Sequence, residues 1–255
     1  MCLESSRKPD AWKLARPVWG WGRGATPRPT PPATVSPEDG SDWKSFRPLG
    51  ISCAATLAGD SDQPVLWHGG NDRALPADRM SREEASGLVE YLVSQIGKGY
   101  TIVTWNGLGF DFDILAEESG MLAECRAIAE THVDMMFHVF CELGHGVGLD
   151  AAARGMGLAG KTKGMSGELA PVLWAQGKRE DVLAYVGQDV RATLELATAC
   201  EALGIFRWVA RSGKVRSMAL SEGWLAVSEA QHLPLPDTSW MDDPWPRTKF
   251  TGWMG

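Results

Sequence analysis

The stretch Tyr100–Leu115, YTIVTWNGLGFDFDIL, decides the fold. Its first six residues are mostly β-branched or aromatic, which predicts a buried central strand. Asn and Gly in the NGLG segment then favour a turn, and a short helix is predicted from Asp111 to about Glu118. A carboxylate at this point lies at the rim of an open α/β sheet, where such folds bind ligands. Asp is also a favoured helix cap, so the spacing alone leaves Asp111 with either role.

Strands and helices alternate on both sides of this stretch. Two further strands are predicted at 49–57 and 65–68, separated by a polar turn. Ser81 and Glu84 form a capping box that opens an amphipathic helix through Ile96. More helices are expected at 121–131, 133–143, 149–155 and 179–203. This alternation predicts an α/β fold with a mixed sheet flanked by helices.

The long helix at 179–203 carries the second feature of interest. Tyr185 and Asp189 are four residues apart and therefore share one helical face. A phenol beside a carboxylate can hold a metal-bound water and assist its deprotonation. The same pair also fits a core tyrosine bonded to a neighbouring aspartate.

Taken together and in this order, the two features resemble the second and third motifs of DEDD 3′–5′ exonucleases. These belong to the ribonuclease H-like superfamily, and the third motif of their tyrosine subclass is Tyr-x-x-x-Asp. The middle motif of one set of these proteins has an Asn, Phe-Asp and a following Leu, as in Asn106, Phe110-Asp111 and Leu115. Other matching segments are Val133–Met135, Gly148–Gly157 and Trp174. The resemblance covers roughly residues 48 to 203.

The resemblance implies a ribonuclease H-like core that hydrolyses phosphodiester bonds with two Mg²⁺ or Mn²⁺ ions. Asp111 and Asp189 would be metal ligands, and Tyr185 would orient the attacking water. Asn106 and Phe110 would position the terminal nucleotide. The expected partner is single-stranded nucleic acid or a 3′ end, either DNA or RNA.

The first motif of the family, Asp-x-Glu on the first strand, is not found. No Asp-x-Glu precedes Leu49, and the nearest acids, including Glu38 and Asp39, lie in a loop-like SPEDGSDW segment. The first strand is therefore missing or replaced, and it is open whether this chain is an enzyme. The side chain of Asp113 is interpreted as pointing away from the site. Asp134 is interpreted as a structural residue.

Three explanations for the missing motif remain open. The chain is a degenerate relative that still binds nucleic acid, or Glu38 or Asp39 substitutes for the lost acids. Alternatively the amino-terminal reading frame is shifted, since the codons for Ala25–Pro29 can spell Asp-Thr-Glu-Thr out of phase. We therefore expect a 3′–5′ exonuclease-like protein that is inactive if the motif is truly lost. The alternatives are a catalytically dead nucleic-acid-binding or replication-associated module and a scaffold for protein contacts.

The net charge of −7 is unusual for a protein that holds phosphates, although a carboxylate-rich metal site is itself acidic. The charge is unevenly spread along the chain. Four cations lie close together in the sequence: Arg207, Arg211, Lys214 and Arg216. They either contact a nucleic-acid backbone or are simply solvated, and the sequence leaves both interpretations open. Five scattered cysteines without a CxxC pair argue against a disulfide framework or a zinc site.

Three regions are predicted along the chain. Residues 1–46 form an irregular Pro/Trp/Arg-rich arm that is either disordered or mistranslated, because its prolines disfavour regular structure. Residues 47–204 form the exonuclease-like core, and residues 205–255 form a small hairpin and a Pro/Trp-rich tail. The sequence contains no apolar run of about 18 residues, so no transmembrane helix is predicted. No signal peptide is recognised at the start either, so a cytoplasmic location is expected.

Overall fold

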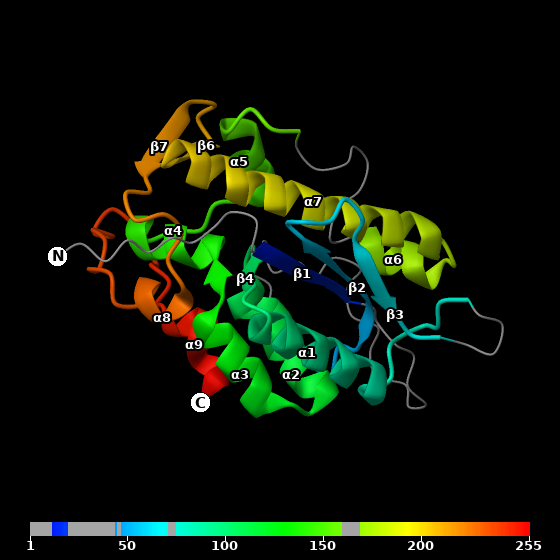
Figure 1. Cartoon of the computed structure of the whole chain (residues 1–255). Helices are drawn as coiled ribbons and strands as arrows, with labels where there is room; N and C mark the ends of the chain where they lie inside the picture. The colour runs from blue at the N-terminus through cyan, green and yellow to red at the C-terminus, as the bar shows by residue number, and fades with distance from the viewer. Residues whose placement is uncertain (1–11, 20–43, 45–46, 71–74, 160–168) are drawn as a thin grey trace.

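The computed structural model describes residues 12–19, 44, 47–70, 75–159 and 169–255 (Figure 1). In this part of the chain a mixed sheet of five strands has the order β3-β2-β1-β4-β5. Three strands overlap the segments predicted to be strands: β2 (Ile51–Ala58), β3 (Val65–His68) and β4 (Thr101–Thr104). A further strand, β5 (Val133–Asp134), occupies the start of the segment 133–143, which was predicted to be helical throughout. The predicted α/β class with a mixed, helix-flanked sheet is confirmed.

The central strand is β1 (Trp12–Trp19), which lies antiparallel to β2 and parallel to β4. Its register places Leu14 opposite Leu57 of β2 and Val103 of β4. The prediction of an irregular arm was wrong for these eight residues. Pro17 argued against a central strand, but β2 and β4 need a partner between them for their backbone groups. The remaining predictions for the arm, including Ala25–Pro29, Glu38 and Asp39, fall outside the described residues.

Two helical layers cover the sheet, as Figure 1 shows. One layer contains α1 (Arg82–Gly97), α2 (Phe112–Ser119) and α3 (Leu122–Thr131). The other contains α5 (Leu149–Gly155), α6 (Leu169–Ala175) and the long α7 (Arg179–Leu203). Cys53, Ala55 and Leu57 of β2 pack in the cluster beneath α7, whereas Ala54 packs in the cluster with α1. The strand is therefore buried on both faces, as its mostly apolar sequence predicted.

The predicted capping box of α1 is confirmed. The Ser81 hydroxyl accepts the backbone N–H of Glu84 at 3.2 Å, and the Glu84 carboxylate accepts the N–H of Ser81 at 2.7 Å. The helix thus begins at the residue after Ser81, because the cap satisfies backbone donors that have no partner within the helix.

The chain beyond α7 returns to the body of the molecule. Strands β6 (Ile205–Val209) and β7 (Val215–Ala219) form an antiparallel hairpin. The short helices α8 (Val227–Ala230), α9 (Thr248–Thr251) and η4 (Gly252–Met254) then pack beside α4 (Met135–Leu143) and α3, as Figure 1 shows. Phe250 of α9 is only 3% exposed. The Pro/Trp-rich tail therefore contributes to the core instead of hanging free.

No helix in the described parts of the chain is long and apolar enough to cross a membrane. The four cysteines found there are buried free thiols: Cys53, Cys125, Cys141 and Cys200. Burial raises the pKa of each thiol to about 12, so they are neutral core residues.

Candidate functional site

Asp111 lies at the end of a single π-helical turn, η3 (Gly107–Asp111), that leads into α2. The wider turn is closed by the N–H of Phe112, which donates to the carbonyl of Gly107. The backbone of Asp111 is already helical, at φ −62° and ψ −47°, and its side chain makes no capping hydrogen bond. The structure therefore excludes the interpretation that Asp111 serves only as a helix cap. Single π-turns are frequent at functional sites.

Steric limits explain the NGLG sequence before Asp111. Asn106 has a φ of +68°, a left-handed conformation that Asn tolerates better than most residues. A Cβ on Gly107 would lie 2.5 Å from the Thr104 hydroxyl, and one on Gly109 would lie 2.8 Å from the Phe250 ring. Asn106 therefore has a backbone role in this turn, and its predicted contact with a nucleotide remains a prediction.

Asp134, at the end of β5, fixes this turn from below. Its carboxylate accepts the backbone N–H groups of Asn106 at 2.9 Å, Leu108 at 2.8 Å and Phe137 at 3.1 Å. Burial raises the pKa of this carboxyl to about 6, although the backbone hydrogen bonds oppose the shift. The structural role predicted for Asp134 is confirmed, and it positions the turn that carries Asp111.

His132 supports the same turn through Thr104. The Nδ1 of His132 lies 2.7 Å from the carbonyl of Ala129, so this nitrogen carries the proton. Its Nε2 then accepts the Thr104 hydroxyl at 3.1 Å, and that hydroxyl accepts the N–H of Gly107 at 3.2 Å. Burial lowers the pKa of His132 to about 4 and keeps the ring neutral. Sequence analysis missed this support, because nothing in the sequence distinguishes a buried histidine from an exposed one.

Tyr185 and Asp189 both lie on the buried face of α7, with exposed fractions of 3% and 2%. Around them Val182, Val186 and Val190 pack on the sheet. Their four-residue spacing places them on one face of the helix, as predicted, and that face is turned to the sheet.

Strand β1 contacts both η3 and α7, so the central strand lies between the two elements that carry Asp111 and Asp189. The sequence of β1 is WKLARPVW, which contains two basic residues and no acid. Its second half extends beyond the residues paired with β4, with Arg16 opposite Ala55 and Val18 opposite Cys53. The strand is therefore present at the position between the two aspartates, but it brings no carboxylate there.

The described residues do not fit the expected pair of divalent ions. A two-metal site needs several oxygen ligands from carboxylates, with water in the remaining positions. Across residues 12–19, 44, 47–70, 75–159 and 169–255, no three His, Cys, Asp or Glu side chains are grouped so that they could hold a metal ion. Asp111 and Asp189 alone are an incomplete donor set.

Asp113, the neighbouring acid, belongs to a different cluster. It is 4% exposed and forms ion pairs with Arg47 and, at 3.9 Å, with Lys44. The prediction that its side chain points elsewhere is thereby confirmed. Phe110 is partly buried and packs against the cluster of α1 and α2, so a nucleotide-stacking role for it also stays a prediction.

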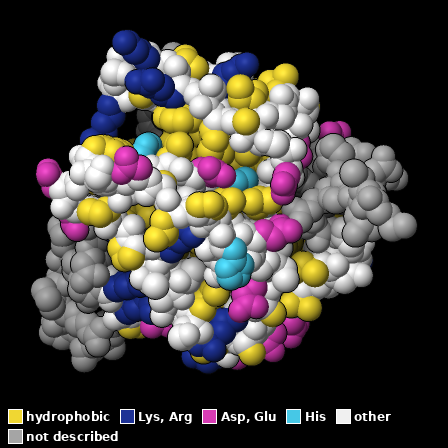
Figure 2. Space-filling view, turned by 90° about the vertical axis from the view of Figure 1, so that its left-hand side faces the viewer, with side chains coloured by type: hydrophobic (Ala, Val, Ile, Leu, Met, Phe, Trp, Pro, Cys, Tyr) yellow, Lys and Arg dark blue, Asp and Glu magenta, His cyan; other side chains and the backbone are white. Residues whose placement is uncertain are grey.

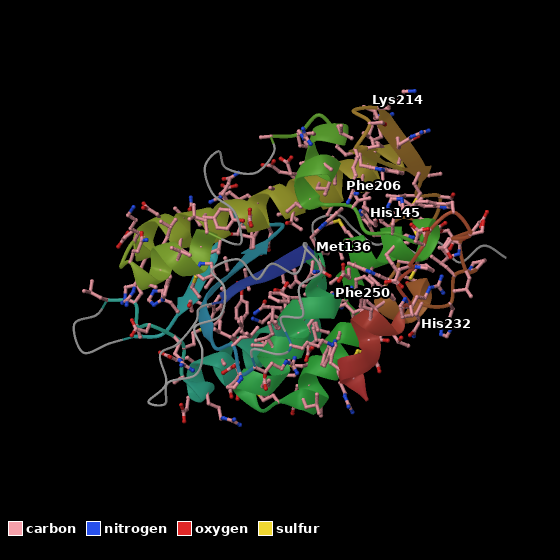
Figure 3. The ribbon with its side chains drawn as sticks, turned by 180° about the vertical axis from the view of Figure 1, so that it is seen from behind. Met136, His145, Phe206, Lys214, His232 and Phe250 are labelled. Carbon is pink, nitrogen blue, oxygen red and sulfur yellow. The ribbon has the colours of Figure 1, made fainter. Side chains whose placement is uncertain are left out.

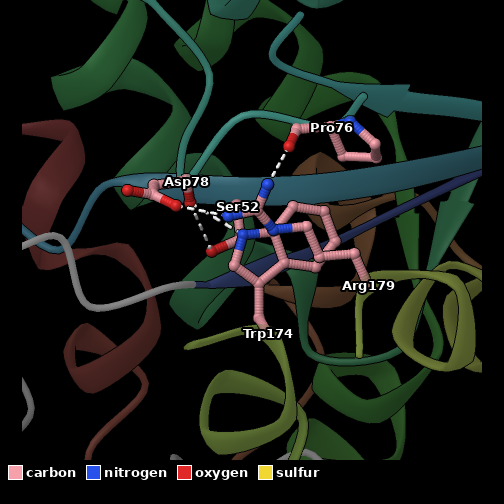
Figure 4. Close-up of polar contacts among 5 residues, drawn as sticks. All are labelled: Ser52, Pro76, Asp78, Trp174 and Arg179. Atoms are coloured by element: carbon pink, nitrogen blue, oxygen red, sulfur yellow. Dashed lines mark hydrogen bonds and ion pairs between the residues drawn. The ribbon is translucent and has the colours of Figure 1, made fainter. Parts of the chain in front are cut away.

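Trp174 and Arg179 hold the start of α7 in place, as Figure 4 shows. The indole Nε1 of Trp174 donates to the carbonyl of Asp78 at 2.8 Å. The Arg179 guanidinium donates to the carbonyl of Pro76, pairs with the Asp78 carboxylate, and lies 5.6 Å from the centre of the Trp174 ring. These contacts join α6 and α7 to the segment before α1, and so fix the helix that carries Tyr185 and Asp189.

The family model that describes the RNase_H superfamily matches residues 65–200 of this sequence. These residues include the turn with Asp111 and the helix with Asp189. The chain belongs to the RNase_H superfamily. The superfamily match begins at β3, so β1 lies outside it. The DEDD tyrosine subclass is a finer assignment and remains a prediction.

One similar solved structure is the family B DNA polymerase from the hyperthermophilic archaeon Pyrobaculum calidifontis. Its TM-score is 0.47 at 18% identity, and the match covers 74% of this chain and 24% of the polymerase. This RNase_H superfamily chain thus spans about a quarter of that polymerase. The search of curated proteins found no match.

Proposed function

We propose that this RNase_H superfamily protein is of the DEDD 3′–5′ exonuclease type, tyrosine subclass. Asp111, Tyr185 and Asp189 form its site, and its partner is a single-stranded 3′ end of DNA or RNA. Support comes from the position of Asp111 on a π-turn without a capping role and from the buried pair on α7.

The sequence and position of β1 indicate whether the chain can hydrolyse its partner. The strand lies between η3 and α7 and contains no Asp or Glu. Hard divalent cations need oxygen ligands, so a site with two of its four carboxylates binds them poorly. We therefore propose that this polypeptide binds a 3′ end but does not hydrolyse it efficiently. This favours the nucleic-acid-binding module over the active exonuclease for the sequence as it stands.

The first test is degradation of labelled single strands, DNA and RNA separately, in the presence of Mn²⁺. The chain is compared with its Asp189→Ala variant. We expect no metal-dependent shortening by either protein. If the unmodified chain shortens strands from the 3′ end and the variant does not, a ligand outside the described residues completes the site. The proposed loss of activity would then be wrong.

The second test adds the missing acids to β1. Positions 16 and 18 lie on one side of the strand, because strand residues alternate between faces, and they belong to its carboxyl half. The variant Arg16→Asp/Val18→Glu is compared with Arg16→Asn/Val18→Gln, which has the same shape without the charge. We expect Mn²⁺-dependent shortening only with the first variant, and its loss when Asp189→Ala is added.

Circular dichroism shows whether both strand variants are folded. If both fold and the acidic variant still degrades neither DNA nor RNA, the exonuclease-type assignment of Asp111 and Asp189 is not tenable. A gain of activity by the Asn/Gln control would equally contradict the role given to the carboxylates.

A further inference from the structure

The β6–β7 hairpin carries a cluster of basic residues, although the chain as a whole is acidic. Between Ile205 and Leu220 the sequence IFRWVARSGKVRSMAL contains four cations and no acid. All four are exposed: Arg207, Arg211, Lys214 and Arg216. Figure 2 shows Lys and Arg side chains gathered at the top of the molecule, at the level of this hairpin.

Several arginines elsewhere in the structure are held by contacts within the chain. Arg154 pairs with Asp150 at 3.0 Å, Arg179 with Asp78, and Arg247 donates to several backbone carbonyls. Within the described residues, the side chains of the four hairpin cations make no hydrogen bond or ion pair. The chain has 32 acidic residues against 25 basic ones, so a shortage of acids is not the reason.

The inner side of the hairpin is packed against the core, although its outer side is exposed. Phe206 and Trp208 face inward and stack with their ring centres 5.4 Å apart, and both are buried. Helix α5 approaches so closely that a Cβ on Gly155 would lie 2.3 Å from the Cα of Trp208. Little backbone freedom is therefore lost when the exposed cations bind a ligand, which reduces the entropic cost of binding.

The inner side of the hairpin contacts the residue that precedes the turn with Asp111. The Phe206 ring centre lies 6.1 Å from that of Trp105, and Trp105 directly precedes the turn that carries Asp111. Figure 3 shows Phe206 inside the molecule and Lys214 at the outer end of the hairpin. The core side of the hairpin therefore packs against the strand end that leads to Asp111.

We propose that the β6–β7 hairpin binds the phosphate backbone of the single strand whose 3′ end occupies the candidate site. This inference rests on the proposed function and adds a surface to it. Cations on a fixed scaffold bind phosphates irrespective of base sequence, and they position the strand without reading it.

The test uses the full chain and a labelled single strand of about 20 nucleotides, longer than a typical single-strand site. Binding is followed by fluorescence anisotropy at several salt concentrations with EDTA present. The hairpin variant is Arg211→Glu/Lys214→Glu, at the exposed turn. The control is Lys98→Glu/Lys178→Glu, two exposed lysines elsewhere, which changes the net charge equally.

We expect the hairpin variant to bind about 10-fold or more weakly at low salt. The slope of log K against log salt should become shallower by about 1.4, which corresponds to two lost phosphate contacts on a single strand. The control should change the slope little. A milder variant, Arg211→Gln/Lys214→Gln, should shift affinity and slope in the same direction as the Glu variant.

Equal effects of the hairpin and control variants would overturn the hairpin inference and leave the proposed function standing. Absence of binding by the unmodified chain would instead overturn the proposed function, and the hairpin inference with it. Sequence-specific binding with no dependence on salt would also contradict the backbone contact.

Discussion

Gly107 shows how a single residue fixes the turn that presents Asp111. A side chain at this position would collide with Thr104, whose hydroxyl must also stay in place to link Gly107 to His132. The constraint is local and steric, because the strand and the π-turn meet with no room for a Cβ.

We predict that Gly107→Ala lowers the free energy of unfolding by about 1–3 kcal/mol, as overpacking of a dense core does. The control is Gly87→Ala in the middle of α1, where no atom lies within 4 Å of the added Cβ. That change should stabilise the chain by about 0.5–1 kcal/mol, since Gly is unfavourable in a helix. Urea unfolding measures both values. Equal free energies of unfolding for the two variants would show that the turn accommodates a Cβ at position 107 without strain.

The acids near the turn also show what sequence reasoning can reach at the residue scale. Asp113 and Asp134 were assigned correctly, to a separate cluster and to a structural role. The choice between cap and functional residue for Asp111 needed the structure. Both roles place an Asp at a helix start, and only backbone angles and hydrogen bonds separate them.

At the scale of elements, the carboxyl-terminal helices have a larger role than the sequence indicated. Phe250 contacts Phe137 and Phe140 with ring centres 5.5 and 4.7 Å apart. The Trp253 indole donates to the carbonyl of Leu108 at 2.7 Å. Phe250 and Trp253 thus contact the turn that leads to Asp111, as Asp134 does.

We predict that Phe250→Ala destabilises the chain by about 3–5 kcal/mol, the usual loss for a buried aromatic residue. Hydrogen exchange of the backbone amides of the Asn106–Asp111 turn should increase in the same variant. The control is Trp240→Ala in the same tail, because this side chain is 65% exposed. Its effect should stay below about 1 kcal/mol. An unchanged exchange rate in the Phe250 variant would show that the tail does not support the turn.

The dependence of stability on pH is a property of the whole molecule, because buried histidines and a buried carboxyl group contribute to it with opposite signs. Burial lowers the pKa of His132 and of His138 to about 4, below the value of an exposed histidine. As the pH falls below about 6.5, the unfolded chain binds protons that the folded chain does not, and stability is lost. Asp134 acts in the opposite sense, because its pKa in the folded state is raised to about 6. Its contribution to stability is fully present below about 4 and is lost as the pH rises through 6.

We therefore predict that Asp134→Asn makes the acid loss of stability steeper. The variant lacks the proton uptake that partly offsets the two histidines between pH 7 and 5. Urea unfolding of both proteins at pH 7, 6 and 5 measures the difference. The gap between wild type and variant should widen as the pH falls. A gap that stays constant would mean that the buried carboxylate is ionised throughout this range.

From the residues alone, the α/β class, the capping box of α1 and most strands and helices between Pro48 and Leu203 were predicted, but β5 and α6 were not. The sequence also determined the pairing of Tyr185 with Asp189 on one helical face. These features depend on local periodicity and on turn chemistry, which neighbouring residues encode.

The three-dimensional contacts were needed to show that WKLARPVW is the central strand, that the tail packs against the turn before Asp111, and that Asp111 does not cap its helix. Each depends on partners distant in sequence. Strand β1 forms because β2 and β4 have backbone groups that need a strand between them, which overrides the unfavourable Pro17. Local propensity contains no information about such a gap, and so the sequence alone predicted an irregular arm there.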